Sequence, residues 1–128
     1  MIDIENQLYT LIKAVLPTGT SMSGEYSPNA TLPLLTMEMK DNSTYDRSYT
    51  MQENHVRTMF EFNAFSNKTS GAKTQCKNII AKVDAEMLSL GFVRTTYSFV
   101  PNLLDATVKR LTARYVGVVG TDKTVYRR

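Results

Sequence analysis

Hydrophobic residues recur along the chain at two spacings, and one of them is the spacing of a helix. In residues 3–16 they follow steps of three and four residues, which is the period of one helix face. The apolar positions of this stretch are Ile4, Leu8, Leu11, Ile12 and Val15. Asp3 is placed to cap the predicted helix, and Pro17 and Gly19 end it.

Residues 71–90 predict a second helix, because their apolar stripe continues without a break. Its members are Ala72, Cys76, Ile79, Ile80, Val83, Met87 and Leu90. The solvated side of this helix is expected to carry Lys82, Asp84 and Glu86. Thr69 or Ser70 is expected to cap its start, and Gly91 is expected to end it in the left-handed conformation.

The second spacing is the alternation of apolar and polar residues, which predicts strands. It occurs in residues 35–40, 56–64, 92–100 and 108–119. In the last of these, one face carries Leu111, Ala113 and Tyr115, and the other carries Arg110, Thr112 and Arg114. Between the first two, the polar residues 41–55 predict the arms and tip of an extended β-hairpin.

Two further segments show neither spacing. Residues 17–31 are rich in Gly, Pro, Ser, Thr and Asn, and they predict a long loop that allows a short strand near Met22. Residues 121–128 predict either a short edge strand or a mobile tail.

The order helix, strand, strand, helix, strand, strand predicts a single α+β domain over residues 1–128. Each helix has one apolar stripe, so both helices are expected to pack on one face of a mainly antiparallel sheet of about four strands. The other face of the sheet is then left to Thr, Arg, Tyr and Asn side chains.

The net charge of +3 changes this picture little. Basic residues gather late in the chain, at Lys109, Arg110, Arg114, Lys123, Arg127 and Arg128. A nucleic-acid-binding domain typically shows a basic stripe with interleaved aromatic residues. A solvated strand face followed by a basic tail explains the bias more simply.

Targeting signals and cysteine chemistry also add little. Cys76 is the single cysteine and falls on the apolar stripe of the second helix, which predicts a buried small hydrophobe and no intramolecular disulfide. The first residues do not form a secretory signal, and no stretch approaches eighteen apolar residues. We therefore expect folding in the cytoplasm and no membrane contact.

The segment SNKTSGAKTQC, residues 66–76, raises the question of a phosphate-binding loop, because Gly71, Lys73 and Thr74 lie where strand gives way to helix. That loop requires Gly, four residues, Gly, Lys, and then Ser or Thr. Neither alignment of the segment supplies both glycines and the lysine. The segment therefore predicts an ordinary helix start.

No other pattern predicts catalysis. His55 is the single histidine and lies in the polar hairpin, so neither a histidine-based triad nor a zinc site with Cys76 is expected. The acidic residues of the strands and hairpin are Glu38, Asp41, Asp46, Glu53 and Glu61, and their spacing selects no catalytic pair. We interpret them as solvated, and we predict no enzyme, cofactor or metal.

The segment AFSNKTSGAKTQCKNIIAKVDAEMLSLGFVRT, followed by VPNLLDATVKRLTARYVGVV, resembles the tail terminator or tail completion proteins of long-tailed bacteriophages, also labelled head-tail joining or minor tail proteins. In that family a strand ending in a phrase such as FSNK leads to an amphipathic helix, a Gly-Phe-x-Arg step and a final strand with Arg and Arg-Tyr. The matching residues here are Phe65, Ser66, Asn67, Lys68, Gly91, Phe92, Arg94, Arg110, Arg114 and Tyr115. The resemblance covers roughly the second half of the chain, and the first half shares only the order of helix and hairpin.

The resemblance implies a structural virion protein. Such a protein is a subunit of a six-fold ring that caps the finished tail tube, ends its polymerisation and offers a joining surface to the head connector. The implied partners are further copies of the chain in a homohexameric ring, the tail tube protein and the head connector or another neck protein, with genomic DNA passing through the lumen. The implied location is the tail or neck of the virion, after assembly in the host cytoplasm.

Two groups of residues are candidates for these contacts. The hairpin group is expected to contact a neighbouring subunit or the tail tube, since Tyr and Arg are enriched at interface hot spots; it consists of Tyr45, Arg47, Tyr49 and His55. The second group, Arg110 and Arg114, is a candidate either to meet acidic residues of the next subunit or to face the lumen, and simple surface exposure is the alternative.

Two other interpretations remain open. A small basic nucleic-acid-binding α+β module fits the element order, although the chain lacks the aromatic RNP sequences and the GxxG loop of the common RNA-binding domains. Another neck or head-tail connector subunit fits the same features.

Overall fold

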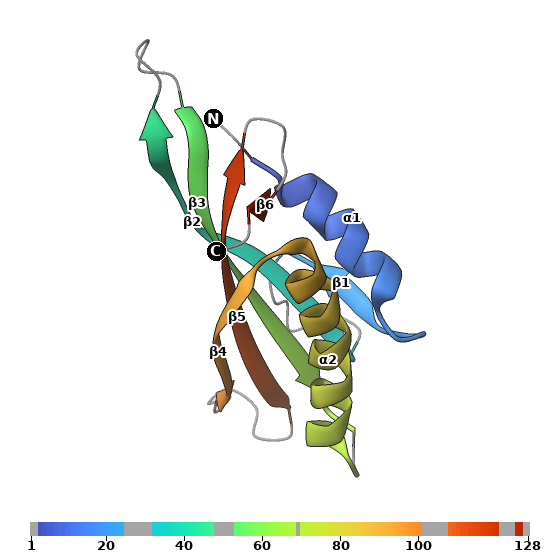
Figure 1. Ribbon diagram of the computed structural model, residues 1–128. Coiled ribbons are helices and arrows are strands. Elements are labelled where there is room, and N and C mark those ends of the chain that lie inside the picture. The colour runs from blue at the N-terminus through green and yellow to red at the C-terminus, as the bar shows by residue number, and fades with distance from the viewer. Residues whose placement is uncertain are drawn as a thin grey trace.

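The computed structural model describes residues 3–24, 32–47, 53–68, 70–100, 108–120 and 125–126. Within these ranges the chain forms two helices and six strands, which together make an α+β fold (Figure 1). In chain order the elements are α1 (Glu5–Val15), β1 (Ser21–Ser23), β2 (Leu34–Arg47), β3 (Glu53–Ser66), α2 (Ala72–Leu90), β4 (Val93–Val100), β5 (Lys109–Gly120) and β6 (Val125–Tyr126).

The strands form one mixed sheet. Five of them lie side by side in the order β1-β2-β3-β5-β4, and β6 pairs with β5 beyond the end of β4. Strand β1 runs parallel to β2, and every other pairing is antiparallel. The predicted strand count of about four is therefore wrong, and the sheet is mixed because of the parallel pairing of β1. The short strand near Met22 and the edge strand within 121–128, which the sequence allowed, are present as β1 and β6; with three and two residues they are too short to show a periodic pattern.

Both helices lie on the same face of the sheet, on the right in Figure 1. Their apolar stripes meet the alternate apolar residues of β2, β3 and β5 in one core. Its largest fully buried side chains include Leu8, Ile12, Phe60, Phe62, Ile79, Ile80, Met87 and Tyr115. Phe60 packs edge-on against Phe92, and Phe62 against Tyr115, with ring centroids 6.0 and 5.8 Å apart. Burying a side chain of this size contributes about 1.5–3 kcal/mol, so this core is the main source of stability.

Only one end of α2 agrees with the sequence prediction. Gly91 ends the helix in the left-handed conformation with φ 108°, and its N–H donates to Leu88 O at 3.1 Å, as predicted. At the start, the capping residue is Gly71 with φ 83°, and no side chain caps the helix. The prediction of a Ser70 cap is therefore wrong, and Thr69 lies outside the described residues. A glycine suits this position because it adopts a positive φ without strain.

At the start of α1, the capping residue is also one position later than predicted. The helix is capped at Ile4, which has no capping side chain of its own. Asp3 nevertheless accepts a hydrogen bond from the N–H of Glu5 at 2.8 Å, so the carboxylate binds the helix start as expected.

The extended hairpin is formed by β2 and β3, which have 14 residues each. Its outer part, residues 41–47 of β2 with 53–59 of β3, is called the arm here, and it extends beyond both helices in Figure 1. Register shifts occur in β2 at Lys40 and at Tyr45, since Met39 pairs with Phe60 while Asp41 pairs with Met59, and Thr44 pairs with Val56 while Asp46 pairs with His55. Such bulges bend a strand and increase its twist.

Candidate interface on the helix-free face of the sheet

The face of the sheet opposite α1 and α2 carries a row of polar and charged side chains from three neighbouring strands. We call it the helix-free face and define its central cluster as Glu38 and Lys40 of β2, Glu61 and Asn63 of β3, and Arg110, Thr112 and Arg114 of β5. The strand register brings these residues together, because Glu61 lies between Glu38 and Arg114, and Asn63 lies beside Thr112.

Glu61 is the centre of an ion-pair network. Its Oε1 accepts hydrogen bonds from Arg114 Nε and Nη2, both at 3.1 Å, and its Oε2 lies 3.3 Å from Lys40 Nζ. Lys40 also donates to Glu38 Oε2 at 2.8 Å. The Glu61 side chain is only 6% exposed, while those of Lys40 and Arg114 are 39% and 44% exposed. Positive and negative charges thus alternate across three strands, with the buried carboxylate in the middle.

The Asn63 amide accepts a second set of hydrogen bonds, two residues further along β3 than Glu61. Its Oδ1 accepts hydrogen bonds from Arg110 Nε at 2.8 Å and from the Thr112 hydroxyl at 2.6 Å. The Arg110 guanidinium also lies over the Phe65 ring, 5.8 Å from its centroid. These contacts fix the guanidinium against the sheet, because a planar guanidinium can donate at its edge while it stacks on a ring.

The bulge in β2 brings an additional acidic residue to the helix-free face. Regular alternation already places Glu38 and Lys40 there, because they are two residues apart, while Met39 belongs to the core side. Lys40 is the extra residue before Asp41, so Asp41 follows on the same face, where its carboxylate lies 3.9 Å from Arg57 Nη1. The bulge thereby adds a carboxylate next to Lys40.

The surroundings shift the pKa values of both partners. Burial raises the pKa of the Glu61 carboxyl, but the hydrogen bonds and charges of Arg114 and Lys40 outweigh burial and hold the pKa below its ordinary value of 4.5. The hydrogen bond to Glu38, together with Glu61, raises the pKa of Lys40 above its ordinary value of 10.5. Both groups are therefore charged at neutral pH, and the network is a fixed pattern of charges.

The chemistry of the cluster is that of a binding surface. It contains carboxylates, an ammonium, guanidinium groups, an amide and a hydroxyl. The Thr112 hydroxyl is 2.6 Å from the Asn63 amide oxygen, and no histidine or thiol belongs to the cluster. At one end it adjoins a small apolar cluster of Leu34, Phe65 and Val108. That apolar cluster is itself buried, so the exposed charges are what a partner would meet. Exposed charges in a fixed pattern can select a protein partner of complementary charge.

The structure brings Arg110 and Arg114 together on this face, and the acid that meets Arg114 belongs to the same chain. The hairpin candidates lie further along the strands, on the arm. Arg47 pairs with Glu53, and His55 pairs with Asp46 on one side and Gly120 on the other. Tyr45 occupies a bulge, so it does not alternate regularly with Arg47. Tyr49 lies outside the described residues.

The sequence interpretation missed two acidic residues. Glu61 is 4% exposed and holds two cations, so the expectation that it is solvated is wrong. Asp84, expected on the wet side of α2, accepts hydrogen bonds from the Tyr115 hydroxyl at 2.7 Å and from Arg94 Nη1 at 2.9 Å. Tyr115 lies 31 residues from Asp84 and Arg94 lies 10 residues from it, and the packing of α2 on the sheet brings the three together. Burial, assisted by Asp84, raises the pKa of the Tyr115 hydroxyl, so Tyr115 remains a donor at neutral pH.

Two other predictions concern α2. Cys76 is fully buried, as expected, and burial raises the pKa of its thiol to about 11, so the thiol is protonated and unreactive at neutral pH. Lys73, from the rejected phosphate loop, extends its ammonium over the Phe99 ring at 5.4 Å from the centroid. It therefore contacts a strand of the sheet.

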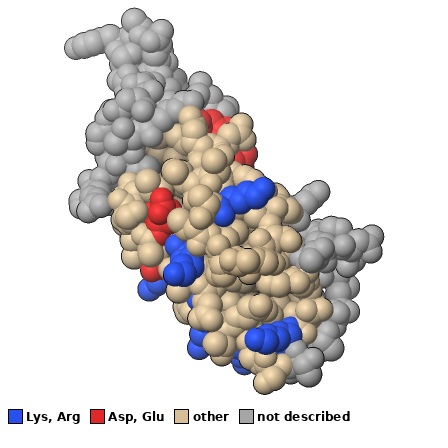
Figure 2. All heavy atoms as spheres, turned by 90° about the vertical axis from the view of Figure 1, so that its right-hand side faces the viewer, with Lys and Arg blue, Asp and Glu red and all other residues tan. Residues whose placement is uncertain are grey.

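The helix side offers a contrast to this cluster. In Figure 2, which views that side, basic and acidic residues form small patches on a mostly uncharged surface. Among the described residues, no group of three or more His, Cys, Asp and Glu side chains is arranged to hold a metal ion. Neither of the helices that the structure describes is long and apolar enough to cross a membrane. Compared with protein-family models and with curated proteins, the sequence matches none.

Proposed function

We propose that this chain is a structural subunit of a ring that caps the tail tube of a long-tailed bacteriophage, ends its polymerisation and offers a joining surface to the head connector. The observation that carries this proposal is the helix-free face. A two-layer domain whose described helices both lie on one side of the sheet, and which fixes charged side chains on the other side, has a surface suited to a further protein layer.

The residues of the family resemblance have structural tasks that support the proposal. Phe65 lies under the Arg110 guanidinium on the helix-free face, and Gly91 ends α2. Arg94 and Tyr115 both bind Asp84 and thereby tie α2 to β4 and β5. The resemblance thus rests on residues that orient the helix and build the candidate interface.

The arm supplies a second contact surface, which continues from the central cluster along the same strands. A ring built by head-to-tail contacts needs two different patches on each subunit. The arm extends past the helices, and the helix-free face lies beside it on the same strands (Figure 1). We assign these two surfaces to that need, one with Arg110 and Arg114 and the other along the strand positions of Tyr45, Arg47 and His55.

The charge pattern favours a protein partner over a nucleic acid. Arg114 is neutralised by Glu61, and Lys40 is shared between Glu61 and Glu38. A nucleic-acid surface gains affinity from cations that are available to phosphates. The cluster instead presents both signs in alternation, so a module dedicated to nucleic acid is the weaker alternative.

The test is negative-stain electron microscopy of the purified protein over a concentration series, with native mass spectrometry of the same samples. We expect closed rings of one stoichiometry. In parallel, any binding to DNA is expected to disappear at moderate salt. A protein that stays monomeric at every concentration, also when isolated tail tubes are added, would contradict the proposal.

A further inference from the structure

Strand β4 forms an unusually open edge of the sheet. Among the described residues it pairs with β5 on one side, and no strand pairs with its other side. Its sequence VRTTYSFV has no Pro or Gly and a single charge, and Val93 and Tyr97 are 50% and 45% exposed. Soluble proteins usually block such edges with short strands, lysines, prolines or bulges, because open edges pair with other chains. The one irregularity of β4 is the shift at Thr95.

The opposite edge of the sheet is open as well, over Met37–Asp41. Strand β1 pairs with β2 only over Leu34–Thr36. No described strand pairs with the outer side of Met37–Asp41. The sheet thus has two free edges of unlike sequence, one on β2 and one on β4.

The strand directions make these two edges compatible. Strand β2 is antiparallel to β3, β3 to β5, and β5 to β4, so β4 runs antiparallel to β2. When copies are related by rotation about an axis along the strands, each strand keeps its direction. The β4 edge of one copy then meets the β2 edge of the next copy in the antiparallel sense, with all helices on one side of the joined sheet.

The register places the free segments at the same height. Reading across β4, β5, β3 and β2, Tyr97 is level with Met37, and Val93 is level with Asp41. Strand β1 ends at Ser23, which pairs with Thr36, one residue before this level. Copies arranged without an axial shift would therefore face Val93–Tyr97 with Met37–Asp41, and each of these segments is free of an outer partner in the described part of the chain.

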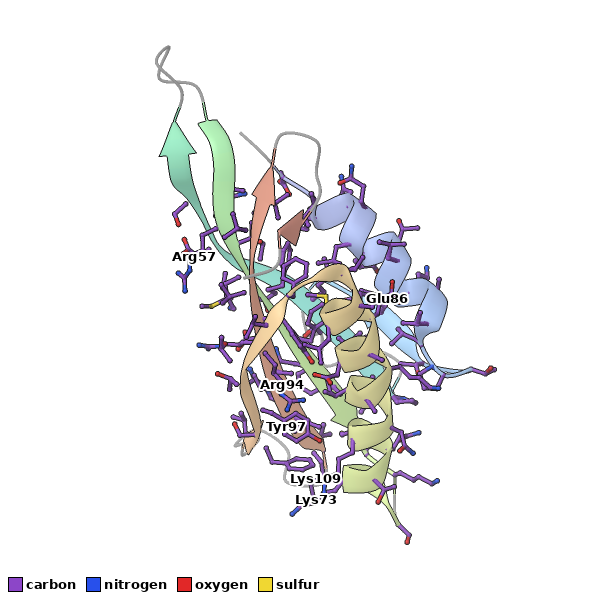
Figure 3. All side chains as sticks on the ribbon, in the orientation of Figure 1. Arg57, Lys73, Glu86, Arg94, Tyr97 and Lys109 are labelled. Atoms are coloured by element: carbon purple, nitrogen blue, oxygen red, sulfur yellow. The ribbon has the colours of Figure 1, made fainter. Side chains whose placement is uncertain are left out.

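The charges of the two segments are complementary. Val93–Tyr97 contains one cation, Arg94, and so carries +1. Met37–Asp41 contains Glu38, Lys40 and Asp41, which sum to −1 + 1 − 1 = −1. Within one subunit Arg94 pairs with Asp84 and Asp41 pairs with Arg57, but the Arg94 and Asp41 side chains are still 44% and 45% exposed. Figure 3 shows Arg94 and Tyr97 along β4.

From these observations we propose that the β4 edge of one copy pairs antiparallel with the Met37–Asp41 segment of the next copy, so that one sheet continues from subunit to subunit. This inference rests on the proposed ring function and names the contact that closes the ring. A continuous sheet keeps all helices on one wall of the ring, so the helix-free face forms the other wall.

Hydrogen–deuterium exchange compares the assembled protein with the dilute monomer. We expect the backbone amides of both segments, 93–97 and 37–41, to become protected together in the assembly. A substitution tests the same contact, and Tyr97→Lys has a matched control in Leu88→Lys on α2, since both side chains are 45% exposed. We expect Tyr97→Lys to raise the concentration needed for assembly about tenfold or more, while Leu88→Lys changes it less than about twofold. Thermal melts of the dilute variants verify that both are folded.

The outcomes separate this inference from the proposed function. Rings whose residues 93–97 exchange as fast as in the monomer would overturn the edge pairing and leave the ring function intact. Protection of residues 93–97 without protection of 37–41 would assign the β4 edge to another occupant and would also overturn it. A protein that never assembles would overturn both proposals.

Discussion

The two faces of the sheet bury their residues to a similar degree by different means. On the helix-covered face, Phe60 and Ile80 are fully buried among other apolar side chains. On the helix-free face, Asn63 and Thr112 are 2% and 4% exposed, although they form a polar cluster. Long side chains such as Arg110 lie over them and supply hydrogen bonds. Burial alone therefore does not distinguish a core from an interface, whereas the chemistry of the buried groups does.

This difference has energetic consequences. Apolar burial is favourable by itself and depends little on salt or pH, while buried polar groups contribute only when their hydrogen bonds are complete. The helix-covered face is expected to set most of the stability. The helix-free face is expected to keep a defined charge pattern at little net gain in stability.

The largest expected effect is on the helix-covered face. Phe60→Ala removes a fully buried ring that packs against Phe92. We expect a loss of about 3–5 kcal/mol in the free energy of unfolding, measured by urea denaturation. Leu88→Ala, at a position 45% exposed, is the control and should change the free energy by less than about 0.5 kcal/mol. Similar losses for both variants would mean that the helix-covered face is not the stabilising core.

On the helix-free face, Glu61→Gln is expected to cost about 1–2 kcal/mol. It removes the carboxylate that binds Arg114 and Lys40, but both cations are partly exposed and regain water. Glu38→Gln is the matched control, because Glu38 also binds Lys40 but is 39% exposed, and it should cost at most about 0.5 kcal/mol. Equal costs would show that the burial of Glu61 has no special importance.

A polar contact on the helix-covered face is expected to contribute about 1 kcal/mol. Tyr115→Phe deletes the hydroxyl that donates to Asp84 and keeps the buried ring. Tyr97→Phe is the control, since the Tyr97 side chain is 45% exposed. Urea denaturation of both variants gives the difference. If Tyr115→Phe is as stable as the wild type, the hydrogen bond to Asp84 does not contribute to the stability of the folded protein.

The smallest effect is the pH dependence of the Glu61 network. The pKa of Glu61 is lower in the folded protein than its ordinary value of 4.5, so the folded state binds this proton less readily than the unfolded state. The stabilisation is therefore complete above about pH 4.5 and is lost as the pH falls through the folded-state pKa. The stability difference between the wild type and Glu61→Gln should shrink between pH 7 and pH 3. A difference that is constant over this range would contradict the shift.

Local sequence patterns predict the elements of this protein well. The stripe from Ala72 to Leu90 predicts α2 within one residue of its observed start, and the alternation at Leu111, Ala113 and Tyr115 identifies the buried side of β5. These predictions succeed because helix and strand periods depend on neighbouring residues only. The position of Cys76 in the core follows for the same reason.

Contacts between distant segments were decided by the tertiary structure. Glu61 and Arg114 are 53 residues apart, and Tyr115 and Asp84 are 31 apart, so no local pattern reveals either pair. The bulge at Lys40 and the parallel pairing of β1 likewise depend on the partner strand. The residue types alone determine which side chains favour burial, because the hydrophobic effect acts on each side chain separately. The tertiary structure determined which charges meet and which strand edges stay open, because register and strand order are set only when the whole sheet packs against its helices.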